Sequence, residues 1–256
     1  MMATHLDDWN GKTVAYIESI GKVKVLLNPL NNLVQTGIFP WPAPEIIQKL
    51  SESTHKSSFT QSHLSSLTGH YCDLQSLNSE DAITWSVFGT LMYHPKENQK
   101  AFVSHLLEMA GVREAVCENT HVWLWRRVPH PDTAGSGGPE LDFGILTDNT
   151  LVFGESKWNS GIAKNQGKKG DKNQIQLRVE FLKKYARKLY PHIQNRRVLL
   201  ITREQDDGFN TKSDDGLAVN NLVWKDVCNI GSHPLSDEVG RYYEWKTTVS
   251  LKEGLK

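Results

Sequence analysis

The stretch "PELDFGILTDNTLVFGESKW", residues 139–158, decides the fold, because two short apolar runs flank the turn signal TDNT. Aspartate and asparagine suit the two central positions of a tight hairpin, since both adopt left-handed backbone readily. If Asp148 and Asn149 hold these positions, residues whose numbers add up to 297 face each other on two antiparallel strands. The sequence therefore predicts a β-hairpin with Asp142 directly opposite Glu155, their Cβ atoms about 5 Å apart.

Three ionisable side chains of this hairpin are expected on one face. Side chains alternate along a strand, so Glu155 and Lys157 share the face of Asp142 while Ser156 points away. Two carboxylates that face each other on a half-buried sheet repel each other unless a cation lies between them. Hard oxygen ligands suit Mg²⁺ or Mn²⁺, and a lysine beside such an ion can orient a water molecule or offset charge on a phosphate. The pattern favours phosphodiester hydrolysis; the alternative is a surface salt link from Lys157 to either acid.

Two other parts of the sequence compete with this assignment. Glu244, Trp245 and Lys246 repeat the E-x-K spacing, but without a mirrored acid upstream or a basic helix downstream, so we treat this copy as coincidence. Pro131 and Asp132 offer a literal proline–acid pair. The glycine-rich segment between that pair and the first hairpin strand makes Asp142 the better placed acid.

The flanking sequence predicts an alternation of helices and strands. Ser79 is a suitable N-cap for a helix that continues through "EDAITWSVFGTL", with Glu80 and Asp81 in its first turn. Further helices are expected at 97–110 and from residue 174 on, where Ile175, Val179, Leu182 and Leu189 lie on one side, and strands at 121–128 and 197–202. A strand that enters a helix is expected at 217–227. This order predicts an α/β sandwich with a mixed central sheet flanked by helices.

The chain is expected to have three parts. Residues 1–70 form an N-terminal extension of unknown role, with a short hairpin at 13–27 and a polar stretch at 51–67. Residues 71–230 form the core, and residues 231–256 form a C-terminal extension that packs on it.

Composition limits the class of protein. The formal net charge is zero, yet residues 155–204 contain 13 Lys or Arg against 4 Asp or Glu, so one side is suited to a polyanion. No apolar stretch approaches the roughly 18 residues of a membrane span, and the N-terminus lacks a secretory pattern, so the cytoplasm is expected. Three widely spaced cysteines, at 72, 117 and 228, predict reduced, mostly buried thiols.

Taken together, these segments resemble the PD-(D/E)XK nuclease superfamily. The resemblance runs from Ser79 to Val227 and rests on the first helix, Asp142, the Glu155-Ser156-Lys157 run, "NQIQLRVEFL", "RVLLIT" and "LVWKDV". It implies a restriction-endonuclease-like αβββαβ core and Mg²⁺- or Mn²⁺-dependent cleavage of nucleic acid. DNA is expected before RNA, although the sequence itself does not separate the two. One departure from the family pattern is that Pro139 precedes Glu140, so Asp142 lacks its own proline.

The resemblance also implies roles for individual residues. Asp142, Glu155 and Glu80 would hold the metal, with Lys157 as the catalytic lysine. Glu80 has an alternative role as a favourable charge on the helix N-terminus. Gln174 is the glutamine expected to face the site; Gln176 is the second choice, and an ordinary solvated glutamine is the third.

Nucleic-acid contacts are expected from the loop at 159–173 and the helix after it, through Lys164, Lys168, Lys169, Lys172 and Arg178. The alternative is a surface loop without a partner. Lys183, Lys184, Arg187 and Lys188 lie largely opposite the apolar side of that helix, where they fit a solvated face equally well.

The resemblance further implies a homodimer or a partner protein, and a role in antiviral defence or restriction. Two rival functions remain: a non-catalytic nucleic-acid-binding or assembly module of the same fold, and a hydrolase of a small phosphorylated molecule. Zinc hydrolases and serine or cysteine nucleophiles have little support, since no H-E-x-x-H or G-x-S-x-G motif occurs.

Overall fold

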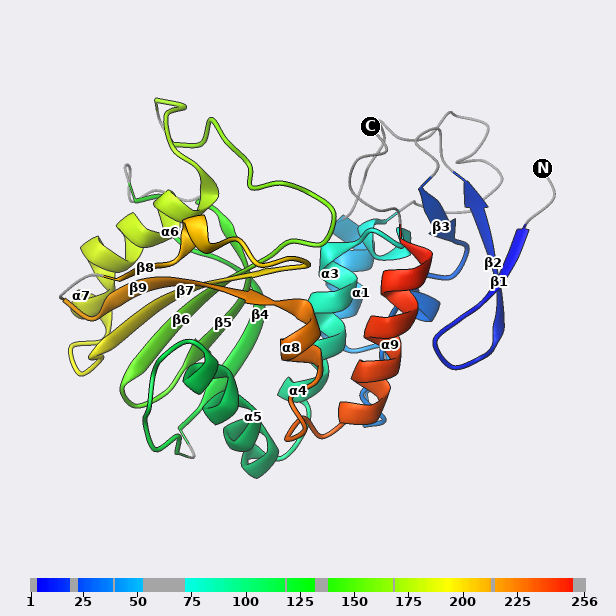
Figure 1. Cartoon of the computed structure of the whole chain (residues 1–256), viewed down its shortest axis with the longest axis horizontal. Coiled ribbons are helices and arrows are strands. Elements are labelled where there is room, and N and C mark those ends of the chain that lie inside the picture. Colours follow the sequence, from blue (N-terminus) through cyan, green and yellow to red (C-terminus); the bar gives the residue numbers. More distant parts are fainter. Residues whose placement is uncertain are drawn as a thin grey trace. The chain divides into compact units, whose positions relative to one another are not determined.

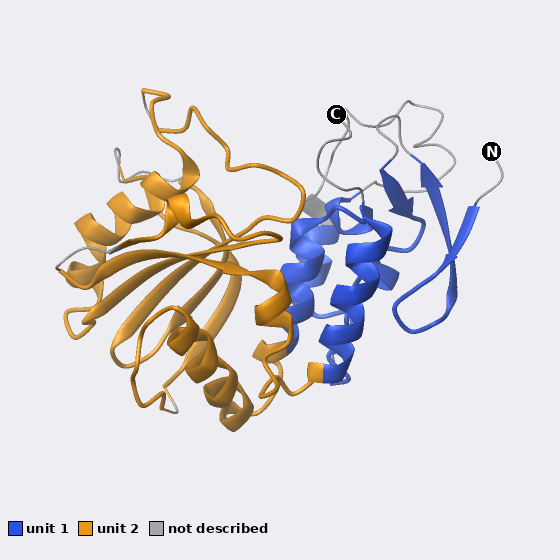
Figure 2. Ribbon diagram, in the orientation of Figure 1, with its two compact units in different colours: residues 1–90, 237–256 blue, residues 91–236 orange. Residues whose placement is uncertain are grey.

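The structure, a computed structural model, describes residues 4–18, 23–38, 40–52, 72–117, 119–131, 138–167, 169–212 and 215–250. The chain forms two compact units, residues 1–90 with 237–256, and residues 91–236 (Figure 2). The prediction divided the sequence after residues 70 and 230, whereas the two units divide it after Thr90 and before Asp237. Lys168, Asp132 and residues 53–67 of the polar stretch lie outside the described residues.

A mixed six-stranded sheet is the centre of the 91–236 unit (Figure 1). Its strand order is β4-β5-β6-β7-β9-β8; β6, β7 and β9 are parallel, and the other neighbours are antiparallel. β6 and β7 are buried along almost their whole length, as expected for strands covered on both faces. The strands are β4 (His121–Arg127), β5 (Glu140–Leu146), β6 (Thr150–Ser156), β7 (Asn195–Thr202), β8 (Thr211–Lys212) and β9 (Leu217–Val223).

Helices cover both faces of this sheet (Figure 1). Ile175, Phe181 and Leu182 pack on one face against Phe153 and Val198, while α5 lies on the other face. The predicted mixed α/β architecture and the predicted order of helices and strands are confirmed. Within the described ranges, none of the helices combines the length and the apolar composition of a membrane span. The helices are α4 (Thr90–Met92), α5 (Lys96–Met109), α6 (Gln174–Phe181), a π-helical turn (Leu182–Ala186), α7 (Arg187–Leu189) and α8 (Trp224–Cys228).

Two glycines of the hairpin make room for aromatic rings on the neighbouring strands. Gly144 pairs with Trp123 and Gly154 pairs with Phe143. A Cβ atom at Gly154 would lie 2.1 Å from the Phe143 ring, and one at Gly144 would lie 2.2 Å from the Trp123 ring. The Phe143 ring is fully buried, so it cannot swing into solvent to make space. These glycines therefore fix the packing directly beside the predicted site.

Replacing Gly154 with alanine is expected to lower the free energy of unfolding by about 1–3 kcal/mol, because the added methyl group overpacks a filled core. Gly161→Ala is the matched control, since no atom lies within 4 Å of its added Cβ. Phe143→Leu should recover part of the loss in a Gly154→Ala background. Urea unfolding measures all three variants; equal stability of the two alanine variants would contradict the packing argument.

The other unit combines the N-terminal segment with the C-terminal helix. β2 and β3 pair antiparallel, which confirms the predicted hairpin, and β1 adds a third strand. α9 packs on this sheet through Trp245 and Val249, and Lys246 Nζ donates to Leu77 O at 2.9 Å. The second E-x-K copy is thus helical. The elements are β1 (Thr4–Asp7), β2 (Thr13–Glu18), β3 (Lys24–Leu26), α1 (Pro44–Glu52), α3 (Glu80–Thr84), a π-helical turn (Trp85–Gly89) and α9 (Ser236–Val249).

The three cysteines are free thiols, as predicted. Cys72 and Cys228 are buried, and burial raises the pKa of both thiols. A raised pKa keeps a thiol protonated and unreactive, so these two cysteines act as small apolar core residues.

Candidate active site

The hairpin has the predicted register, with paired residue numbers that add up to 297. Thr147 N donates to Thr150 O at 2.9 Å, which leaves Asp148 and Asn149 as the two turn residues. Neither has the positive φ on which the prediction relied, so that part of the prediction is wrong. The Thr147 hydroxyl instead accepts the N–H of Thr150 at 2.9 Å, and this side-chain contact helps to close the turn.

The carboxylate of Asp148 is engaged at the turn itself. It accepts hydrogen bonds from Cys117 Sγ at 2.6 Å and from Asn119 Nδ2 at 3.2 Å. These donors, Cys117 first, hold the pKa of Asp148 below its usual range. Asp148 therefore offers a natural control for Asp142, because both acids belong to one hairpin but lie at opposite ends of β5.

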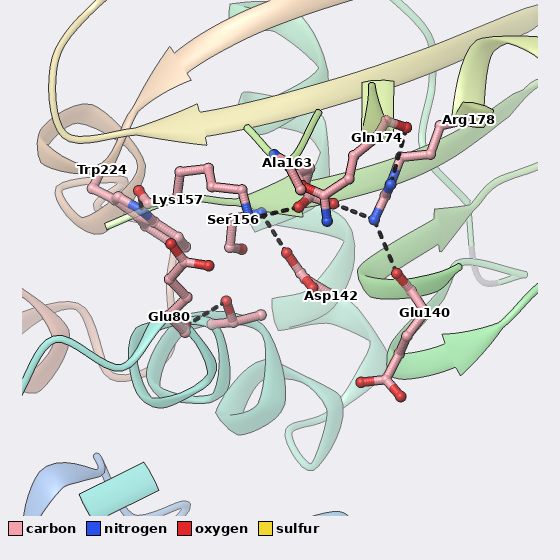
Figure 3. A network of polar contacts seen from close by, with 11 residues as sticks. Glu80, Glu140, Asp142, Ser156, Lys157, Ala163, Gln174, Arg178 and Trp224 are labelled. Atoms are coloured by element: carbon pink, nitrogen blue, oxygen red, sulfur yellow. Dashed lines mark hydrogen bonds and ion pairs between the residues drawn. The ribbon is translucent and has the colours of Figure 1, made fainter. Parts of the chain in front are cut away.

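Asp142 lies where β5 loses its regular pairing. The pairing with β6 ends at Phe143 and Gly154. The predicted pair of Asp142 with Glu155 is the next position of this register, but these two residues do not pair. There, Asp142 Oδ2 accepts the backbone N–H of Ser156 at 2.6 Å (Figure 3). This side-chain bond fixes the Asp142 carboxylate against the segment that contains both Glu155 and Lys157.

The other neighbour of Asp142 is distorted as well. Leu124 pairs with Phe143 and Arg126 with Leu141, so the register places Trp125 opposite Asp142, although these two residues do not pair. Trp125 has a φ of 49°, a left-handed conformation that is costly for a bulky residue. Pairing with β6 thus ends before Asp142, and pairing with β4 skips Asp142 and resumes at Leu141. Nothing in the sequence of β4 signals this distortion.

Glu155 is buried between two cations. Its side chain is 1% exposed; Lys157 Nζ lies 2.7 Å from Oε1, and the Arg178 guanidinium pairs with Oε2. The salt link from Lys157 to Glu155, the alternative to a catalytic lysine, is thus present, but it is buried and not on an exposed sheet face, since the Lys157 side chain is only 10% exposed. The backbone of Lys157 is held too: its N–H donates to Ile201 O at 2.8 Å, and its carbonyl accepts from Trp224 Nε1 at 3.0 Å.

Arg178 faces the protein rather than the solvent. Its guanidinium is 1% exposed and donates to Glu140 O at 2.9 Å and to Gln174 O at 3.1 Å, besides its ion pair with Glu155 (Figure 3). A cation buried in this way has no surface to offer to a phosphate. The prediction that Arg178 contacts nucleic acid is therefore wrong, and its partner is a site carboxylate.

The two candidate glutamines have different surroundings. Gln174 Oε1 accepts the N–H of Ala163 at 3.1 Å, and Gln174 N donates to Ala163 O at 3.2 Å, so this residue ties the loop to the start of α6. Gln176 is exposed and accepts the N–H of Asn173 at 2.7 Å as part of the helix cap. Gln174 is thus the glutamine beside the Arg178 network, and its catalytic role stays a prediction.

The loop at 159–173 has internal structure of its own. An isolated antiparallel bridge joins residues 166 and 172, and Lys172 Nζ pairs with Glu180 at 2.6 Å. Lys164 and Lys169 are exposed, whereas Lys168 lies outside the described residues. Among the loop lysines predicted to bind nucleic acid, Lys164 and Lys169 therefore have the exposure that a phosphate contact needs.

Glu80 belongs to the other compact unit. Ser79 Oγ accepts the N–H of Ala82 at 3.1 Å, which confirms the predicted N-cap, and Glu80 lies in the first turn of α3. Its carbonyl accepts the Thr84 hydroxyl at 2.8 Å. The role of the Glu80 side chain as a metal ligand stays a prediction.

The residues of the 91–236 unit fit a hard divalent cation. Asp142 and Glu155 supply carboxylate oxygens from neighbouring strands, the ligands that Mg²⁺ and Mn²⁺ prefer. Of the two Glu155 oxygens, Oε2 lies against Arg178, and Oε1 lies 2.7 Å from Lys157 Nζ. No cluster of three or more His, Cys, Asp or Glu side chains that could hold a metal occurs among the described residues.

Comparisons with models of known protein families, with curated proteins and with solved structures find no match.

Proposed function

We propose that this chain is a divalent-metal-dependent nuclease with a restriction-endonuclease-like core, and that DNA is its preferred substrate. The observation that supports it most is that the Asp142 carboxylate accepts the N–H of Ser156 at 2.6 Å, while Lys157 Nζ lies 2.7 Å from Glu155. Glu155 and Lys157 are buried and Asp142 is half-buried beside them, and desolvation of such charges is costly, so they are expected to serve a purpose. A catalytic site gives them such a purpose.

Each residue has a distinct part in this proposal. Asp142 and Glu155 would hold Mg²⁺ or Mn²⁺, which supplies Lewis acidity and a nucleophilic water when bound. The Lys157 ammonium is placed to donate hydrogen bonds to the attacking water or to a non-bridging phosphate oxygen. It thereby offsets the negative charge that develops as water adds to phosphorus and the P–O bond to the leaving oxygen breaks.

The test is cleavage of supercoiled plasmid, linear duplex DNA, single-stranded DNA and RNA with Mg²⁺, Mn²⁺ or EDTA. Wild type should cut DNA only with a divalent metal, Asp142→Asn should not cut, and Asp148→Asn on the same hairpin should cut like wild type. Cleavage that persists in EDTA or in Asp142→Asn would contradict the proposal. Metal-independent DNA binding without cleavage would favour the non-catalytic module.

The exposed loop lysines give a prediction about binding. The variant changes Lys164 and Lys169 to serine in the Asp142→Asn background, and K is its association constant for duplex DNA. The slope of log K against log[salt] should become shallower by about 0.9 for each phosphate that the protein no longer neutralises. Lys183→Ser with Lys188→Ser removes the same charge from exposed helix positions and is the control. Equal slopes for the two double variants would contradict a specific role of the loop.

A further inference from the structure

Arg178 joins the elements that hold the candidate metal ligands. Its guanidinium contacts Glu155 on β6, the carbonyl of Glu140 on β5 and the carbonyl of Gln174 on α6. Glu140 lies two residues before Asp142 on the same strand. One buried side chain therefore connects both acid-bearing strands with the helix that covers them (Figure 3).

The chemistry of arginine suits this position better than that of lysine. Guanidinium is planar, permanently charged and presents several N–H donors in fixed directions, so it can satisfy separate acceptors at once. Lysine places one compact ammonium on a flexible chain and cannot reproduce that fork. With Arg178 on Oε2, the Glu155 carboxylate cannot turn freely, and Oε1 is the oxygen directed to Lys157.

We propose that Arg178 is a positioning residue that holds Glu155 through Oε2, so that Glu155 offers Oε1 alone to a divalent cation shared with Asp142. This inference rests on the proposed metal-dependent function and assigns Arg178 a role within it. Removal of a residue that hydrogen-bonds to a metal ligand and orients it, without touching the metal, commonly weakens metal binding by about 10–100-fold. The role of Arg178 is therefore measurable without any nucleic acid.

The experiment is calorimetric titration of Mn²⁺ into the full chain for wild type, Arg178→Lys and Arg178→Met. Both substitutions should weaken Mn²⁺ binding by about 10–100-fold, because neither replacement side chain provides the fixed N–H donors of a guanidinium. Arg196→Met is the control: Arg196 is 2% exposed and pairs at 2.9 Å with Asp215, which is half-exposed, so the replacement also removes a buried, ion-paired arginine, but away from Glu155. Its Mn²⁺ affinity should equal that of wild type.

Several results would overturn the inference. Wild-type affinity in Arg178→Lys would mean that charge alone matters, and tighter binding in Arg178→Met would mean that Arg178 only repels the cation. No Mn²⁺ binding by wild type would reject the proposed function together with this inference, whereas wild-type binding with unaffected variants would reject the inference alone. The Mn²⁺-induced rise in Tm gives a second readout for a variant that is too unstable for calorimetry.

Discussion

Replacing Lys157 with methionine is expected to slow DNA cleavage by about 10²–10³-fold, the usual effect of losing one group that stabilises the transition state. The same substitution should strengthen Mn²⁺ binding by at least about tenfold, because it removes a positive charge that competes for Glu155. The competing ammonium lies 2.7 Å from Oε1, the oxygen that we assign to the metal. Opposite changes in affinity and rate identify a lysine that acts in catalysis and not in metal binding.

Methionine is the suitable replacement because it keeps an unbranched side chain of similar length, and Glu155 retains its ion pair with Arg178. Lys183→Met removes the same charge from an exposed helix position and should change neither quantity. Plasmid cleavage gives the rate, and calorimetry without DNA gives the Mn²⁺ affinity. Weaker Mn²⁺ binding in Lys157→Met would show that the lysine positions Glu155, and unchanged cleavage would show that it has no catalytic part.

The sequence predicted the hairpin well because its information is local. A two-residue turn between two short strands fixes the register, which the structure shows from Leu146 and Leu151 to Phe143 and Gly154. The helices and strands from residue 80 to 202 followed from the same kind of pattern, in which periodicity and capping residues indicate each element. These features depend on neighbours within a few residues, so no knowledge of the tertiary structure was needed.

The surroundings of Glu155 were not predicted because they depend on distant contacts. Arg178 was counted among the surface cations, although it lies between Ile175 and Leu182 on the apolar side of its helix. An arginine on the apolar side of a helix indicates a buried ion pair, because burial of a permanent charge requires a carboxylate partner. Trp125 gave no comparable signal: tryptophan favours strands, and its left-handed backbone arises from the local geometry opposite Asp142.

Replacing Glu155 with methionine is expected to lower the free energy of unfolding by about 3–5 kcal/mol, because it leaves a buried arginine without its anion. Arg178 cannot avoid this cost by losing a proton, because a guanidinium stays charged in proteins. Arg178→Met should be milder on its own, since Glu155 keeps Lys157 at 2.7 Å. Urea unfolding of the single variants measures both losses.

The double variant Glu155→Met with Arg178→Met decides whether this pair stabilises the fold or serves the site. Apolar side chains of similar volume often replace a buried ion pair without loss, so the double variant should regain most of the stability that Glu155→Met loses. It should still bind Mn²⁺ poorly and cut no DNA. Recovered stability without recovered function would mean that the charges are retained for chemistry; a double variant as unstable as Glu155→Met would mean that the fold itself depends on this ion pair.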